Sequence, residues 1–204
     1  GLEERVPFLE VLAVDRGDAP EAYRRGAAAV ASDDHANAIQ LLQAALTKHP
    51  DIDWLKEAAN FYLGEAYRST GRYDDAVKAY EAVVAAKADS RWLAATRSGH
   101  AKALTSAGKY ADAERVLNGF VSEADAKKVP RRLVLAAREL LGANLEAQKK
   151  FAEAASSYDS VAREAKNLIK DDPAALDRYL AATRSRASCL VKDGKFDEAN
   201  KAIE

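Results

Sequence analysis

Two columns of small residues recur five times along this chain of 204 residues. One column falls in the middle of each expected first helix: Gly26, Gly64, Ala101, Gly142 and Ala187. The other falls early in each expected second helix: Ala38, Ala76, Ala113, Ala154 and Ala199. Because longer side chains would push two helices apart, these columns predict that the two helices of each unit cross closely.

Two columns of larger residues accompany the small ones. A ring stands three residues before each second-helix alanine, as His35, Tyr73, Tyr110, Phe151 and Phe196. A large apolar residue stands four residues after that alanine, as Leu42, Tyr80, Leu117, Tyr158 and Ile203. We expect the ring to fill the space above the crossing and neighbouring units to bury the remaining apolar stripe, since no single pair is stable alone.

The clearest unit resembles the tetratricopeptide repeat. It runs Asn60-Phe61-Tyr62-Leu63-Gly64-Glu65-Ala66-Tyr67, then Gly71-Arg72-Tyr73-Asp74-Asp75-Ala76, then Ala79-Tyr80. The family's Leu-Gly-x-x-Tyr and Ala-x-x-x-aromatic spacings are matched, whereas Asn60 replaces its tryptophan and Ala88 its closing proline. The resemblance implies an all-α, right-handed superhelical solenoid of about five helix-turn-helix units.

The spacing of the expected turns exceeds the family period of about 34 residues. The turn positions Asp33, Gly71, Gly108, Lys149 and Gly194 are 38, 37, 41 and 45 residues apart. These separations predict one added turn on each first helix and a longer second helix over residues 152–170, stopped by Asp171-Asp172-Pro173. Elongated units of this kind resemble those of bacterial cell-envelope tetratricopeptide proteins.

The expected organisation is one array preceded by a short segment. Residues 1–17 contain an apolar stretch, Val6-Pro7-Phe8-Leu9-Glu10-Val11-Leu12, which predicts an N-terminal helix that forms a cap or a partial repeat. The array over 18–204 divides into units at about 19–52, 53–89, 90–128, 129–172 and 173–204, the last one incomplete. We expect the natural protein to continue past residue 204, because a solenoid usually closes with a polar capping helix.

Composition disfavours two classes of function. There are 31 basic and 32 acidic residues, a net charge of -1, and nucleic-acid binding normally requires a surplus of positive charge. No apolar run approaches the roughly 18 residues that cross a bilayer, so this segment is not expected to insert into a membrane.

The compartment is left open by the sequence. The chain starts at Gly1 and contains no methionine, so we expect a trimmed or mature fragment from which a leader can have been removed. Cys189 is the only cysteine, which excludes an intrachain disulfide without fixing the compartment. The resemblance favours the bacterial cell envelope or periplasm over the cytoplasm.

Candidate catalytic, metal-binding and cofactor-binding residues are few. His35 falls in the ring column, His49 beside Pro50 in a turn, and His100 where the family prefers leucine. No His-x-x-x-His or Cys-x-x-Cys spacing supports a zinc site, and Cys189 is interpreted as a small buried hydrophobe. We therefore expect no catalytic residue, no metal and no cofactor.

Paired charges have ordinary structural interpretations. Asp33-Asp34, Asp74-Asp75 and Asp171-Asp172 sit at predicted helix starts, where carboxylates cap helices and interact favourably with the helix dipole. The densest basic tract, Lys127-Lys128-Val129-Pro130-Arg131-Arg132, falls in the connection between the third and fourth units. It is interpreted as a solvated loop, with a site for an acidic partner as the alternative.

The resemblance also indicates where a partner would bind. In the family, the first helices line a concave groove that holds an extended peptide or a helix. Carrying these columns onto the chain gives a predicted partner-binding set of Tyr23, Phe61, Glu65, Arg68, Ser98, Lys102, Glu139, Glu146 and Arg184. Tyr23 and Phe61 are expected to present rings to the partner, and the charged members to orient it.

The sequence thus predicts a non-catalytic scaffold that binds a protein or peptide partner in a concave groove. Two alternatives stay open. One is a self-association or structural module, so that a homo-oligomer is not excluded. The other is the interaction domain of a larger protein whose activity lies outside this segment.

Overall fold

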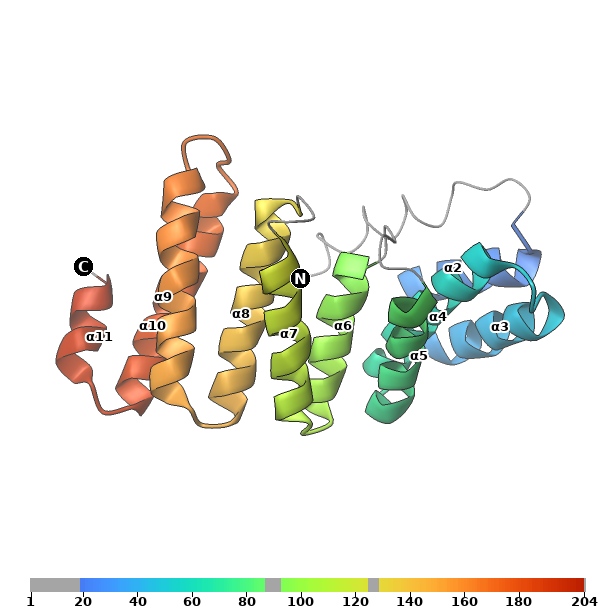
Figure 1. The fold of residues 1–204 in the computed structure, drawn as a ribbon, viewed down its shortest axis with the longest axis horizontal. Helices are drawn as coiled ribbons and strands as arrows, with labels where there is room; N and C mark the ends of the chain where they lie inside the picture. Colours follow the sequence, from blue (N-terminus) through green and yellow to red (C-terminus); the bar gives the residue numbers. More distant parts are fainter. Residues whose placement is uncertain (1–18, 87–92, 125–128, 204) are drawn as a thin grey trace. The chain divides into compact units, whose positions relative to one another are not determined.

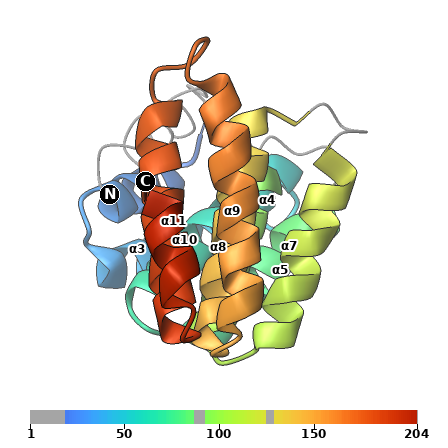
Figure 2. The ribbon, with the colours of Figure 1, turned by 90° about the vertical axis from the view of Figure 1, so that its left-hand side faces the viewer.

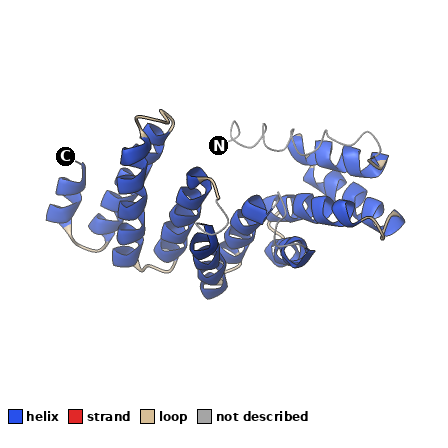
Figure 3. Cartoon of the chain, turned by 45° about the horizontal axis from the view of Figure 1, so that its top comes forward, coloured by secondary structure: helices blue, strands red, loops and turns tan. Residues whose placement is uncertain are grey.

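The computed structural model describes residues 19–86, 93–124 and 129–203, and in these ranges the chain consists of helices and loops with no strand (Figure 3). The expected all-α fold is therefore confirmed. The expectations for residues 1–17, for Ala88 and for the Lys127-Lys128 part of the basic tract lie outside the described residues.

The chain divides into two compact units, residues 1–103 and 104–204, with the division inside one helix. The described part of unit 1 contains α2 (Glu21–Ala31), α3 (His35–Lys48), α4 (Asp53–Ser69), α5 (Tyr73–Ala86) and most of α6 (Leu93–Ser106) (Figure 1). Unit 2 contains the end of α6 and then α7 (Tyr110–Ala124), α8 (Arg131–Ala147), α9 (Phe151–Leu168), α10 (Ala175–Lys192) and α11 (Phe196–Ile203).

The small columns lie at helix crossings, as predicted. A β-carbon placed on Gly64 would come within 2.5 Å of the Tyr80 ring, and one on Gly142 within 2.8 Å of the Tyr158 ring. The same holds for Gly26, where the distance to Leu42 is 2.7 Å. Each glycine of the first helix therefore faces the large apolar residue of the second helix, a pairing that requires the absence of a side chain. The second-helix alanines are likewise buried: Ala38, Ala76, Ala113, Ala154 and Ala199.

The large columns are exposed in the last helix pair, contrary to the prediction. Tyr158 of α9 is 6% exposed and packs in a cluster with Cys189 and Leu190 of α10. The corresponding residues of α11 are 62% exposed at Phe196 and 64% at Ile203. The physical reason is that α10 covers α9, whereas no described helix covers the equivalent face of α11.

Helix lengths and starts follow the spacing of the sequence. The first helices α4 and α8 have 17 residues each and α10 has 18, and the second helix α9 also has 18. Asp34 caps α3 by accepting a hydrogen bond from the Asn37 backbone at 3.4 Å. Asp172 accepts one from the Ala174 backbone at 3.1 Å just before α10. These carboxylates are exposed and have structural roles.

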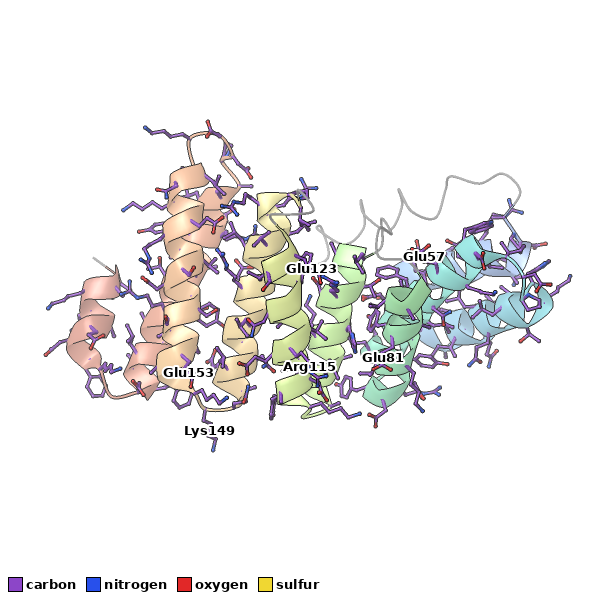
Figure 4. All side chains as sticks on the ribbon, viewed as in Figure 1. Glu57, Glu81, Arg115, Glu123, Lys149 and Glu153 are labelled. Carbon is purple, nitrogen blue, oxygen red and sulfur yellow. The ribbon has the colours of Figure 1, made fainter. Side chains whose placement is uncertain are left out.

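The turns between paired helices use a left-handed residue. Gly71, Gly108 and Gly194 have φ of 76°, 75° and 78°, and the other two turns place Asp33 at 59° and Lys149 at 61°. A left-handed conformation strains a residue that has a β-carbon, and a lysine side chain offers no compensating local hydrogen bond of the kind that aspartate can form. Figure 4 shows Lys149 pointing away from the helices at the α8–α9 turn.

Replacing Lys149 with glycine is expected to raise the free energy of unfolding by about 0.5–1 kcal/mol, because glycine adopts this backbone without strain. The matched control is Lys150→Gly, at a residue with φ of -83°, where no gain is expected. Urea denaturation followed by circular dichroism measures both changes. A loss of stability in Lys149→Gly would show that the left-handed turn is not strained.

Candidate protein-interaction surface

The two rings of the predicted partner-binding set are buried, which corrects the expectation that they face a partner. Tyr23 and Phe61 are each 3% exposed. Tyr23 meets Trp54 and Tyr62 edge-on, with ring centroids 5.6 and 6.1 Å apart. Phe61 meets Tyr62 at 5.6 Å. The family columns do not take account of the neighbouring rings of Trp54 and Tyr62, which bury both residues.

These rings belong to a continuous aromatic chain in unit 1. Phe61 contacts Tyr80 of α5 at a centroid distance of 6.5 Å, and Tyr80 contacts His100 of α6 at 6.3 Å. Tyr80 is fully buried and His100 is 7% exposed. The pairs among α2, α4 and α5 are edge-to-face, a geometry that adds roughly 0.5–1.5 kcal/mol beyond area burial, and the Tyr80–His100 pair to α6 is tilted. These rings therefore form a core rather than a ligand surface.

A polar network closes this core on α4. The Tyr80 hydroxyl donates to Glu65 Oε1 at 2.5 Å, and Arg68 donates to Glu65 Oε2 at 2.9 Å. Glu65 and Arg68 are each 17% exposed at the side chain. Burial and the Glu65 carboxylate raise the pKa of Tyr80 well above its ordinary value, so its hydroxyl stays protonated and donates at neutral pH. Two predicted contact residues are therefore held by partners within the chain.

The sequence signal for this network is Gly99, which lies in α6 and was not singled out by the repeat columns. A β-carbon on Gly99 would be 2.6 Å from the Tyr80 hydroxyl and 2.9 Å from Glu65 Oε1. Gly99 therefore leaves the space in which the hydroxyl and the carboxylate meet. The neighbouring members of the predicted set, Ser98 and Lys102, are half-buried and exposed, respectively.

In unit 2 the predicted residues of α8 form ion pairs with α10. Glu139 accepts from Arg178 at 2.9 Å, and Glu146 accepts from Lys192 at 2.5 Å. All four side chains keep contact with solvent, with exposures of 31% and 25% in the first pair and 29% and 46% in the second. Exposed Ala143 lies between the two glutamates on α8. We call Glu139, Ala143 and Glu146, with Arg178 and Lys192, the α8–α10 face.

Arg184, the last residue of the predicted set, is exposed on α10. Its Nε donates to the Leu180 backbone carbonyl at 3.3 Å in its own helix. The structure thus brings Glu139 and Glu146 onto one face with partners from α10, and it leaves Arg184 on the open side of that helix.

A buried amide and a buried thiol hold equivalent places in α8 and α10. Asn144 accepts from Thr105 at 2.9 Å and donates to the Tyr110 carbonyl at 3.1 Å, a role that the repeat columns did not reveal. Cys189 is fully buried, as predicted. Burial, followed by the charge of Glu146, raises the pKa of Cys189 to about 11, so the thiol is protonated and unreactive at neutral pH.

The remaining candidates for chemistry are embedded in structural contacts. His35 lies 3.5 Å from Asp33, and half-buried His49 ends α3. Arg131 of the basic tract pairs with Glu164 at 3.0 Å. Within the described ranges no cluster of His, Cys, Asp and Glu is placed to hold a metal ion. None of the described helices is long and apolar enough to cross a membrane.

Comparison with known proteins agrees with this architecture. Residues 29–99 match the tetratricopeptide repeat family. This stretch of the chain has the sequence pattern of the tetratricopeptide repeat. It includes α4 and α5, whose Gly64–Tyr80 contact carries the family pattern. No curated protein gives a significant match to the chain.

Solved structures extend the likeness to most of the chain. A putative kinesin light chain of Podosopora anserina with nearly identical TPR-like repeats is similar at 21% identity and a TM-score of 0.72, over 89% of this chain and 90% of that one. MamA AMB-1 is similar at 19% identity and a TM-score of 0.62, over 90% and 94%. These identities establish the fold alone, so the chain is TPR-like in fold. The cell-envelope likeness stays a prediction.

Proposed function

We propose that this protein is a non-catalytic scaffold that binds a peptide or helix of a partner protein on its first helices. The observation that carries the proposal is the α8–α10 face. Its two glutamates belong to the predicted first-helix set and flank an exposed alanine, and its four charged side chains lie about a quarter to a half in solvent. A small residue between charged pairs allows a partner backbone to approach while the charges orient it.

The charge pattern defines the partner that suits this face. Glu139 and Glu146 are seven residues apart on α8, which places them about 10 Å apart along the helix axis. Each carboxylate accepts from one cation of α10, and the two oxygens of a carboxylate offer about four lone-pair sites in all. A segment that carries basic side chains two helical turns apart would satisfy both carboxylates, whereas an acidic segment would be repelled by them.

A displayed library of random peptides, selected on the purified protein, tests this proposal. Peptides enriched on the protein are expected to be basic at two positions and to lose roughly tenfold or more in affinity to the double variant Glu139→Lys, Glu146→Lys. Glu153→Lys is the control, because Glu153 is exposed on α9 and outside the face (Figure 4). Peptides that bind the double variant as well as the natural protein would overturn the assignment of this face.

A further inference from the structure

Large exposed apolar residues are concentrated at one end of unit 2. Those of the described chain all lie on α10 or α11: Leu176, Leu180, Val191, Phe196 and Ile203, between 44% and 64% exposed. Such a concentration is characteristic of protein interaction sites. Figure 2 views this end directly, with the short α11 in front and the N-terminal half of α10 extending beyond it.

The open side of α10 is a continuous stripe. Its exposed residues recur at helical spacing: Asp177, Leu180, Ala181, Arg184, Ser188 and Val191. The opposite side of α10 packs against α9, through Ala182 and Tyr179. Another side carries Arg178 and Lys192, which pair with α8. The stripe is therefore the part of α10 that the chain's own contacts leave available.

The charges of the stripe are complementary under a two-fold axis. The sequence midpoint of Asp177 and Arg184 falls between Leu180 and Ala181. If two α10 helices cross antiparallel at that midpoint, Asp177 of each copy lies opposite Arg184 of the other. Among the described residues, neither Asp177 nor Arg184 forms an ion pair. The Arg184 side chain donates instead to the Leu180 carbonyl of its own helix. Leu180 and the small Ala181 then meet their counterparts at the centre.

We propose that the Asp177–Arg184 stripe of α10 binds a second copy of this chain in an antiparallel, two-fold dimer. Two copies bury Leu180 at the axis. They form two Asp177–Arg184 ion pairs around it, because a two-fold axis repeats each contact. Ala181 at the centre permits close approach of the two helices. The dimer does not require the α8–α10 face, and it assigns Arg184 to the second copy rather than to a partner peptide.

Sedimentation equilibrium over a wide range of protein concentrations tests the dimer. The natural chain is expected to show a monomer–dimer equilibrium. Arg184→Asp alone and Asp177→Arg alone place like charges opposite each other, and each is expected to weaken dimerisation roughly tenfold or more. The double variant Asp177→Arg, Arg184→Asp restores opposite charges and is expected to recover most of the affinity. Recovery distinguishes pairing between copies from simple damage to the fold.

Three results would overturn the dimer: a natural chain that stays monomeric at every concentration, single charge variants that dimerise normally, or growth beyond two copies. Leu180→Asp provides an independent check, since a carboxylate at the axis is expected to abolish the dimer while circular dichroism stays unchanged. Peptide binding by Glu139 and Glu146 is measured separately, so failure of the dimer leaves the proposed partner site standing, and the reverse.

Discussion

Replacing Tyr80 with alanine is expected to lower the free energy of unfolding by about 3–5 kcal/mol, the usual cost of emptying a large aromatic site. Tyr80 of α5 is fully buried and contacts two other helices of unit 1, α4 and α6. Its ring faces Gly64 of α4, lies near Phe61, and reaches Gly99 and His100 of α6. Neither glycine can fill the cavity, and Glu65 loses the hydroxyl that donates to it.

Tyr80→Phe separates the ring from the hydroxyl. It keeps the packing and removes only the donor to Glu65, so a smaller loss of about 1–3 kcal/mol is expected for a partly buried carboxylate that retains Arg68. Urea denaturation of both variants, with midpoint and slope compared, gives the two values. If alanine cost no more than phenylalanine, the ring would not be a core element and the described packing of α4, α5 and α6 would be wrong.

The Gly64–Tyr80 crossing is also the clearest case of what the sequence predicts. A small residue and a large apolar residue recur at matched places in five units, which has a single steric explanation, and in this unit the Tyr80 ring lies where a β-carbon on Gly64 would be. The long second helix, expected over residues 152–170, is α9 at Phe151–Leu168. Such features depend on neighbours within one helix pair, and for this reason short-range spacing is sufficient to predict them.

The partner-binding residues illustrate what spacing cannot predict. Phe61 and Tyr23 occupy the family's groove columns, but their exposure depends on contacts with Trp54, Tyr62 and Tyr80, which the column pattern does not include. Glu65 is tied to Tyr80 because Gly99, far away in the sequence, leaves room for both. A small residue that leaves space for residues far away in the sequence can be recognised only in the three-dimensional arrangement of the helices.

The exposure of Phe196 and Ile203 in α11, which were expected to be buried, also depends on residues outside their own helix pair. Phe196 and Ile203 satisfy their columns as well as Phe151 and Tyr158 do, but burial of a column requires the following helix. In α9 that helix is α10, and its Cys189 and Leu190 complete the cluster. Repeat stability is a property of neighbouring units, so a column alone does not determine exposure.

Replacing Gly142 with alanine is expected to destabilise the protein by about 1–3 kcal/mol, although alanine is the better helix former. The added β-carbon would lie 2.8, 2.9 and 3.1 Å from three atoms of the Tyr158 ring, which is itself 6% exposed. Either the Tyr158 ring or the α8 backbone must shift to make room. The crossing of α8 and α9 is then packed less closely. The intrinsic gain in helix propensity, about 1 kcal/mol, offsets only part of this loss.

Gly119 provides the matched control within the same unit. It lies inside α7, and a β-carbon there would meet nothing within 4 Å. Gly119→Ala is therefore expected to stabilise the protein by about 0.5–1 kcal/mol, the ordinary benefit of removing glycine from a helix.

The central claim is that small side chains allow the paired helices to cross closely, and the difference in unfolding free energy between Gly142→Ala and Gly119→Ala tests it most directly. Both variants are measured by urea denaturation under identical conditions. The account predicts opposite signs, with Gly142→Ala less stable and Gly119→Ala more stable than the natural protein. If both substitutions raised stability, the glycine column would have no steric role at the α8–α9 crossing, and the account would be contradicted.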